Sequence, residues 1–158
     1  MILDLQTMFS GTVAADGTKS AQAITATAIS TNVLDLRNAA TPTLVDEALQ
    51  GSDLWLVIQV AQAFNTLTSL TITLESDSTA NLATSATVHY STGAILLAAL
   101  TANTIVARTR LPSGLYERYL GVRYTVTGTN PTQGSVLAFL TANVDRNLAY
   151  PSGFTIDV

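Results

Sequence analysis

The 158-residue sequence has no cysteine and very little charge. The absence of cysteine excludes disulfides, thiolate metal sites and cysteine nucleophiles. Charged residues make up 11% of the chain, whereas about a quarter is usual in soluble proteins. Hydrophobic residues reach 47%, which indicates a folded chain rather than a disordered one. We therefore expect a single domain over residues 1–158, with a largely neutral surface that partners cover.

Cations are the scarcer charge. One Lys and six Arg stand against 11 acidic residues, giving a formal net charge of −4, so no dense phosphate-binding patch and no nucleic acid partner are expected. The chain carries no cation before Lys19, so a secretory signal is not expected. Residues 54–74 and 78–107 lack charge altogether, but polar residues interrupt both segments every few positions. Neither segment is expected to span a membrane.

Threonine is the most abundant residue, with 25 copies, and it suits the exposed positions of β-strands. Residues 69–75 alternate apolar and polar side chains, which predicts a half-buried strand. Residues 54–61 are almost continuously apolar, which indicates a strand covered on both faces or one whose outer face meets another chain. Two further strands are predicted over 119–127 and 135–144, joined by the turn at 128–134.

Weaker signals complete the expected set of elements. They predict strands at 23–28, 32–36, 93–99 and 104–110, and short helical turns at 43–49 and 78–84. About eight strands with few helical segments predict an all-β fold, a two-sheet antiparallel sandwich of jelly-roll or Greek-key type. Of these, we favour the jelly roll.

The two ends are predicted to be extended arms. The N-terminal arm, residues 1–9, and the C-terminal tail, residues 150–158, are both rich in apolar side chains that need a partner surface. Their candidate interface residues are Met1, Ile2, Leu3, Leu5, Met8, Phe9, Tyr150 and Phe154. Each arm is expected to be near energetic balance alone and to order on binding. The alternative is that residues 1–9 pair within their own sandwich as an edge strand.

Four arginines form a second set of candidate interface residues. Arg108 and Arg110 lie two apart on a predicted strand and therefore share a face. Arg118 and Arg123 can join them if they lie on a neighbouring strand, and the set can then bind acidic partner side chains bidentately. The alternative is that the four separately keep the sandwich soluble.

No pattern in the sequence predicts catalysis or a bound cofactor. His89 is the one histidine, with no acid nearby in sequence, so a metal site or a Ser-His-acid site requires distant residues. Gly-x-Ser-x-Gly, Gly-x-Gly-x-x-Gly, phosphate-loop and EF-hand patterns are absent. We expect no enzyme, no cofactor and no metal.

Aromatic residues leave a second functional hypothesis open. A carbohydrate-binding β-sandwich in a tail or adhesin requires an aromatic platform, for which the candidates are Trp55, Tyr116, Tyr119, Tyr124 and Tyr150. Trp55 lies in the most apolar segment, so packing in the core is its expected role.

Several segments, in order along nearly the whole chain, suggest a family. They include Met-Ile-Leu-Asp at residues 1–4, Leu-Val-Ile-Gln-Val at 56–60, Ser-Leu-Thr-Ile-Thr-Leu at 69–74 and Ala-Tyr-Pro-Ser-Gly-Phe at 149–154. The sequence resembles the capsid cement proteins of certain short-tailed bacteriophages, the Bbp16-like family. It departs from that family in a longer stretch around residues 40–52 and near Lys19.

The resemblance implies a structural role. It implies a jelly-roll protein that is made in the host bacterial cytoplasm and binds the outer surface of an assembled icosahedral capsid in the virion. There it clamps neighbouring copies of the phage major capsid protein and stabilises the DNA-filled shell, with no enzymatic site. A homo-oligomer at the symmetry axes is expected, a dimer in preference to a trimer.

Overall fold

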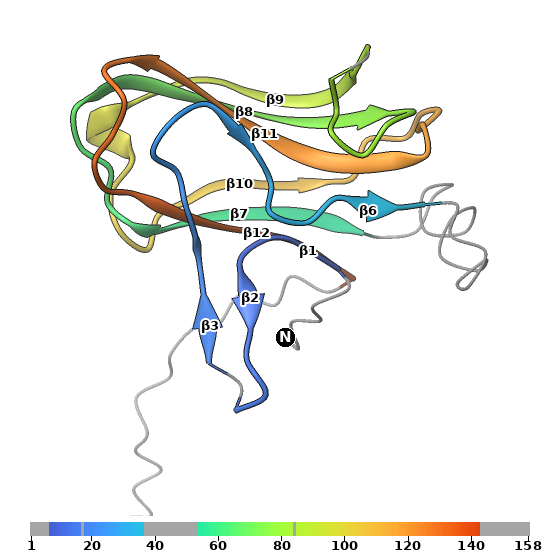
Figure 1. Ribbon diagram of the computed structural model, residues 1–158, viewed down its shortest axis with the longest axis horizontal. Helices are drawn as coiled ribbons and strands as arrows, with labels where there is room; N and C mark the ends of the chain where they lie inside the picture. The colour runs from blue at the N-terminus through green and yellow to red at the C-terminus, as the bar shows by residue number, and fades with distance from the viewer. Residues whose placement is uncertain (1–6, 17, 37–53, 84, 143–158) are drawn as a thin grey trace, which may run out of the picture.

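The computed structural model describes residues 7–16, 18–36, 54–83 and 85–142. In these residues two five-stranded antiparallel sheets pack face to face (Figure 1). The predicted all-β sandwich is confirmed. The described ranges contain no helix long and apolar enough to cross a membrane.

Sheet 1 has the strand order β1-β12-β7-β10, and β4 also pairs with β12. Its strands are β1 (Met8–Ser10), β4 (Gln22–Ala23), β7 (Trp55–Gln62), β10 (Ile105–Arg110) and β12 (Ser135–Thr141). Sheet 2 has the order β5-β11-β8-β9, and β6 also pairs with β11. Its strands are β5 (Ala28–Ile29), β6 (Leu34–Asp35), β8 (Leu67–Asp77), β9 (Thr87–Leu96) and β11 (Tyr119–Gly128).

The chain crosses repeatedly between the two sheets, with β8 and β9 as one hairpin within sheet 2. The chain passes from β7 in sheet 1 to β8 and β9 in sheet 2, then to β10, β11 and β12 in sheets 1, 2 and 1. This connectivity is compatible with a jelly roll. A separate hairpin of β2 (Thr12–Val13) and β3 (Lys19–Ser20) projects from the outer side of sheet 1 (Figure 1).

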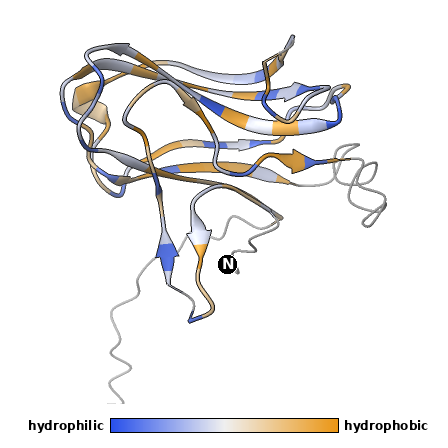
Figure 2. Cartoon of the chain, viewed as in Figure 1, coloured by the Kyte–Doolittle hydropathy of each residue, from blue (hydrophilic) through white to orange (hydrophobic). Residues whose placement is uncertain are grey.

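The core lies between the inner faces of the two sheets. The alternation predicted for residues 69–75 is confirmed, because Leu70, Ile72 and Leu74 are fully buried in it. Figure 2 shows the same alternation of apolar and polar residues along β11. A polar contact between the hydroxyls of Ser10 and Tyr124, at 2.7 Å, crosses the core, and burial raises the pKa of Tyr124.

Of the weaker predictions, the strand at 104–110 is confirmed by β10, but several others were less accurate. The strand predicted at 93–99 is displaced, since β9 runs from Thr87 to Leu96 and residues 97–99 form a 3₁₀ turn. The segment predicted at 23–28 contains only the ends of two short strands, β4 and β5. Residues 78–83 form turns and bends instead of a helical turn. For β4, β5 and β9, pairing with β12, β11 and β8 decides the conformation, and local propensity does not show it. Residues 78–83 pair with no strand, and hydrogen bonds to Asp77 hold their turn. The turn expected at 43–49 lies outside the described residues.

The prediction of a loose N-terminal arm is wrong for Met8 and Phe9. Both side chains are fully buried, and β1 pairs with β12 through Met8 and Ser10. Successive side chains of a strand point to opposite faces, so Phe9 enters the main core while Met8 packs on the outer face of sheet 1. The alternative of an edge strand therefore holds for these residues. Met1, Ile2, Leu3, Leu5, Tyr150 and Phe154 lie outside the described residues.

Candidate interaction surface

The four candidate arginines do not share one face. Arg108 and Arg110 are both exposed on β10, two residues apart as predicted. However, β10 belongs to sheet 1, whereas Arg123 lies on β11 of sheet 2 and Arg118 immediately precedes that strand. The prediction that the four gather on neighbouring strands is wrong, because β11 pairs with β8 and not with β10.

The two arginines of sheet 2 are paired with acids of the same chain. Arg118 binds Asp35 bidentately, with its Nε 3.0 Å from Oδ1 and its Nη2 2.9 Å from Oδ2. Arg123 donates from Nε to Glu75 Oε2 at 2.8 Å and from Nη2 to the carbonyl of Leu82. Both guanidinium groups therefore bind acceptors of the same chain and help to hold the fold together.

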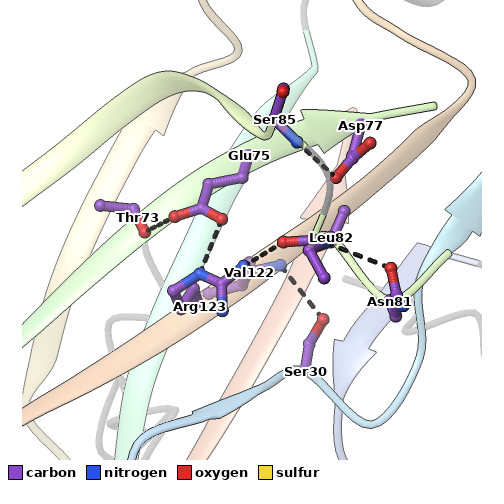
Figure 3. A network of polar contacts seen from close by, with 10 residues as sticks. Ser30, Thr73, Glu75, Asp77, Asn81, Leu82, Ser85, Val122 and Arg123 are labelled. Carbon is purple, nitrogen blue, oxygen red and sulfur yellow. Dashed lines mark hydrogen bonds and ion pairs between the residues drawn. The ribbon is translucent and has the colours of Figure 1, made fainter. Parts of the chain in front are cut away.

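Part of the outer face of sheet 2, around Gly121 and Arg123, carries a network of polar contacts with the turn that follows β8 (Figure 3). The carboxylate of Asp77 accepts the backbone N–H groups of Thr79 and Ser85, which holds the turn after β8. Leu82 from that turn is 1% exposed and lies over Gly121, where an added Cβ would come within 2.8 Å of it. At this end of the face the turn therefore packs over β11.

The outer face of sheet 1 is covered over its β12 side. Met8, Val57 and Phe139 form a small second apolar cluster there, with Val13 of the β2–β3 hairpin packed against it. This cluster explains why residues 54–61 are apolar on both faces of their strand. Val57 points outward and is buried by residues of the same chain.

The β7–β10 side of the same face carries a different set of residues. In the strand register Trp55 lies opposite Arg110, Val57 opposite Arg108, and Gln59 opposite Ile105, and opposite residues of antiparallel strands share a face. We name Trp55, Gln59, Ile105, Arg108 and Arg110 the β7–β10 surface. Ile105 is 52% exposed and Trp55 is only partly buried.

The core role expected for Trp55 is therefore wrong. The side chain is on the outer face with Val57 and belongs to neither buried cluster. The outward position of Trp55 follows from the alternation of a strand. Leu56, Ile58 and Val60 take the inner positions, which leaves the odd-numbered residues on the outer face. The exposure of Ile105 does not follow from alternation, since it results from a register shift between Ile105 and Ala107.

The aromatic platform of the carbohydrate hypothesis is not assembled by the described residues. Tyr124 is fully buried, Tyr116 stacks on His89 with ring centroids 4.1 Å apart, and Tyr119 lies under the guanidinium of Arg118. Tyr150 lies outside the described residues. No group of three or more metal-binding side chains occurs in the described part of the chain either.

A serine and the histidine do meet. Ser76 Oγ lies 2.7 Å from His89 Nε2, and the same oxygen accepts the backbone N–H of Glu117 at 3.0 Å. Ser76 is fully buried, so a substrate cannot reach its hydroxyl. The pair acts as a structural contact between β8, β9 and the segment that precedes β11.

His89 makes folding sensitive to pH. Burial lowers the pKa of His89, although the charge of Glu117 acts in the opposite direction. The unfolded chain, with a histidine pKa of about 6.5, then binds more protons than the folded one just below that pH. We expect the free energy of unfolding to fall as the pH drops below 6.5. The contribution of His89 becomes constant below the pKa that it has in the folded chain.

Urea titrations of the wild type and of His89→Gln between about pH 5 and 7 measure this effect. The variant is expected to lose part of the slope of stability against pH in this window. An equal slope in both proteins would show that His89 is not the group responsible.

Comparison with known proteins supplies the family. A search of the curated proteins found no match. The profile of the Bbp16 family matches residues 18–140, which include β3 to β11 and nearly all of β12. The chain therefore belongs to the Bbp16 family, a phage-associated family.

Proposed function

We propose that the protein is a capsid cement protein. It binds the outer surface of an icosahedral phage capsid in the virion and clamps neighbouring major capsid subunits, which stabilises the DNA-filled shell. Membership of a phage-associated family is the observation that carries the proposal. The protein acts through contact surfaces and performs no reaction.

The physical character of the chain supports this role. Only 11% of its residues are charged, so a partner can cover much of its surface without desolvating many ions. A protein that bridges several subunits gains avidity from contacts that are individually weak. Packaged DNA pushes a shell outward, and such bridges oppose the separation of subunits without any change in the shell's own fold.

The proposal includes self-association. A capsid has repeated symmetry axes, and a dimer at a two-fold position joins equivalent subunits through one interface used twice. A trimer at three-fold positions is the alternative arrangement. The stoichiometry of the protein on saturated shells distinguishes the two.

Binding to purified shells tests the function. We expect the protein to co-sediment with expanded shells that lack their cement layer, to saturate at a fixed ratio to the major capsid protein, and to raise the temperature at which the shells break. An unrelated β-sandwich protein of similar size is the control. Absence of both co-sedimentation and protection would overturn the proposal, and saturable binding on a glycan array in its place would favour the carbohydrate hypothesis.

A further inference from the structure

Residues 111–118, which join β10 of sheet 1 to β11 of sheet 2, cover part of the main core. Leu111 and Tyr116 of this segment are partly buried and pack against the core cluster. Between them lies Leu115, whose side chain is 96% exposed. The position of the segment therefore decides how much apolar surface of the core is covered.

A histidine and a serine hold this segment. The backbone N–H of Glu117 donates to Ser76 Oγ of β8 at 3.0 Å, and the same oxygen lies 2.7 Å from His89 Nε2 of β9. The ring of Tyr116 stacks on the imidazole of His89, with ring centroids 4.1 Å apart. The hydroxyl of Thr87 adds a longer hydrogen bond to Glu117 Oε1 at 3.2 Å. A change at the imidazole therefore acts on the segment at two consecutive residues, Tyr116 and Glu117.

The hydrogen bonds of Ser76 fix the protonation state of His89. Ser76 is fully buried, so its hydroxyl cannot donate to bulk water. Within the described part of the chain this hydroxyl contacts only the Glu117 N–H and His89 Nε2. Because the N–H of Glu117 is itself a donor, the hydroxyl must donate to Nε2, which can accept only when it carries no proton. His89 is therefore neutral when the segment is closed, with its proton on Nδ1.

Few charged groups act on His89. It is flanked on β9 by uncharged residues, of which Tyr90 is titratable. Burial lowers the pKa of His89 and outweighs the negative charge of Glu117, which acts in the opposite direction. Burial also raises the pKa of Tyr116 to about 12, so the stacked ring stays neutral near neutral pH. Three other charged residues close in sequence to Ser76 or Glu117 bind groups elsewhere in the chain: Glu75, Asp77 and Arg118.

We propose that His89 is an acid-sensitive latch that holds residues 111–118 closed when neutral and releases them when protonated. Protonation places a hydrogen on Nε2, so the Ser76 hydroxyl loses its only acceptor, and a buried donor without an acceptor is costly. Opening at Tyr116 and Glu117 relieves this cost, because water then solvates both the imidazolium and the hydroxyl. The paired strands of the two sheets stay folded. The latch is a property of the chain itself and does not depend on the proposed capsid role.

Amide hydrogen exchange followed by NMR on the full chain tests the latch. Between about pH 7 and 5, the protection factor of the Glu117 amide is expected to fall at least about threefold more than that of the Val60 amide. Val60 lies on the central strand β7 and donates to the carbonyl of Thr104, so its amide reports on the sandwich itself. His89→Gln does not titrate in this range, so the ratio of the two protection factors should stay constant in it. The ring nitrogen shifts of wild-type His89 at pH 7 should show the tautomer with the proton on Nδ1.

Several results would overturn the latch. Equal losses of protection at Glu117 and Val60 would show that acid destabilises the whole sandwich without a local opening. A proton on Nε2 at pH 7, or the same selective loss at Glu117 in His89→Gln, would show that His89 does not control the segment. Ser76→Ala gives a second measurement that does not need the His89 variant to fold. Its removal of the buried hydroxyl should raise the pKa of His89 followed by NMR, and an unchanged pKa contradicts the proposal.

Discussion

Replacing Phe9 by alanine is expected to lower the free energy of unfolding by about 3 to 5 kcal/mol, the range for a large aromatic side chain removed from a packed core. Phe9 is fully buried in the main cluster, although it lies near the start of the sequence. The backbone around it is held from two sides, because the N–H of Asn32 donates to the carbonyl of Phe9 and β1 pairs with β12. Urea denaturation followed by fluorescence or circular dichroism measures the loss.

Val88→Ala is the control for this prediction. Val88 is 54% exposed on the edge strand β9, so its truncation should change the free energy of unfolding by no more than about 0.5 kcal/mol. If Phe9→Ala is as mild as Val88→Ala, then β1 is not an integral strand of the sandwich in solution and the loose-arm interpretation returns.

The strands that the sequence predicts well are the long ones with regular alternation. Residues 69–75 fall inside β8, and 119–127 coincide with β11, because a period of two in hydrophobicity is a property of the strand alone. β1 offers no such signal. It has three residues, all buried, so it shows no alternation, and only its pairing with β12 makes it a strand.

The candidate surface could be predicted only in part. The spacing of Arg108 and Arg110 places them on one face, which depends on local geometry alone. The separation of Arg118 and Arg123 from them depends on which strands pair, and their acidic partners are 83 and 48 residues away in sequence. Local patterns carry no information about such pairs, so the sequence leaves open which arginines the fold neutralises.

Arg123→Met is expected to be the most damaging change on the outer face of sheet 2. Glu75 is 5% exposed and receives hydrogen bonds from Arg123 and from the hydroxyl of Thr73. Without the guanidinium its buried carboxylate has no opposing charge, and removal of one partner from a buried ion pair costs about 3 kcal/mol or more. The turn that carries Leu82 also loses the donor to its carbonyl. Chemical denaturation at neutral pH measures the cost.

Two further variants show whether the unpaired charge is the cause. Glu75→Gln/Arg123→Met removes both charges, so it should be more stable than Arg123→Met alone, since burying a neutral amide costs less than burying a lone carboxylate. Arg118→Met breaks the ion pair with Asp35, in which the arginine side chain is 48% exposed. This variant should lose much less free energy of unfolding, because water solvates both groups. If Arg118→Met and Arg123→Met lower the free energy of unfolding equally, the greater burial of the Arg123–Glu75 pair does not make it the more stabilising one. The network of Figure 3 would then contribute to the shape of this face without contributing to its stability.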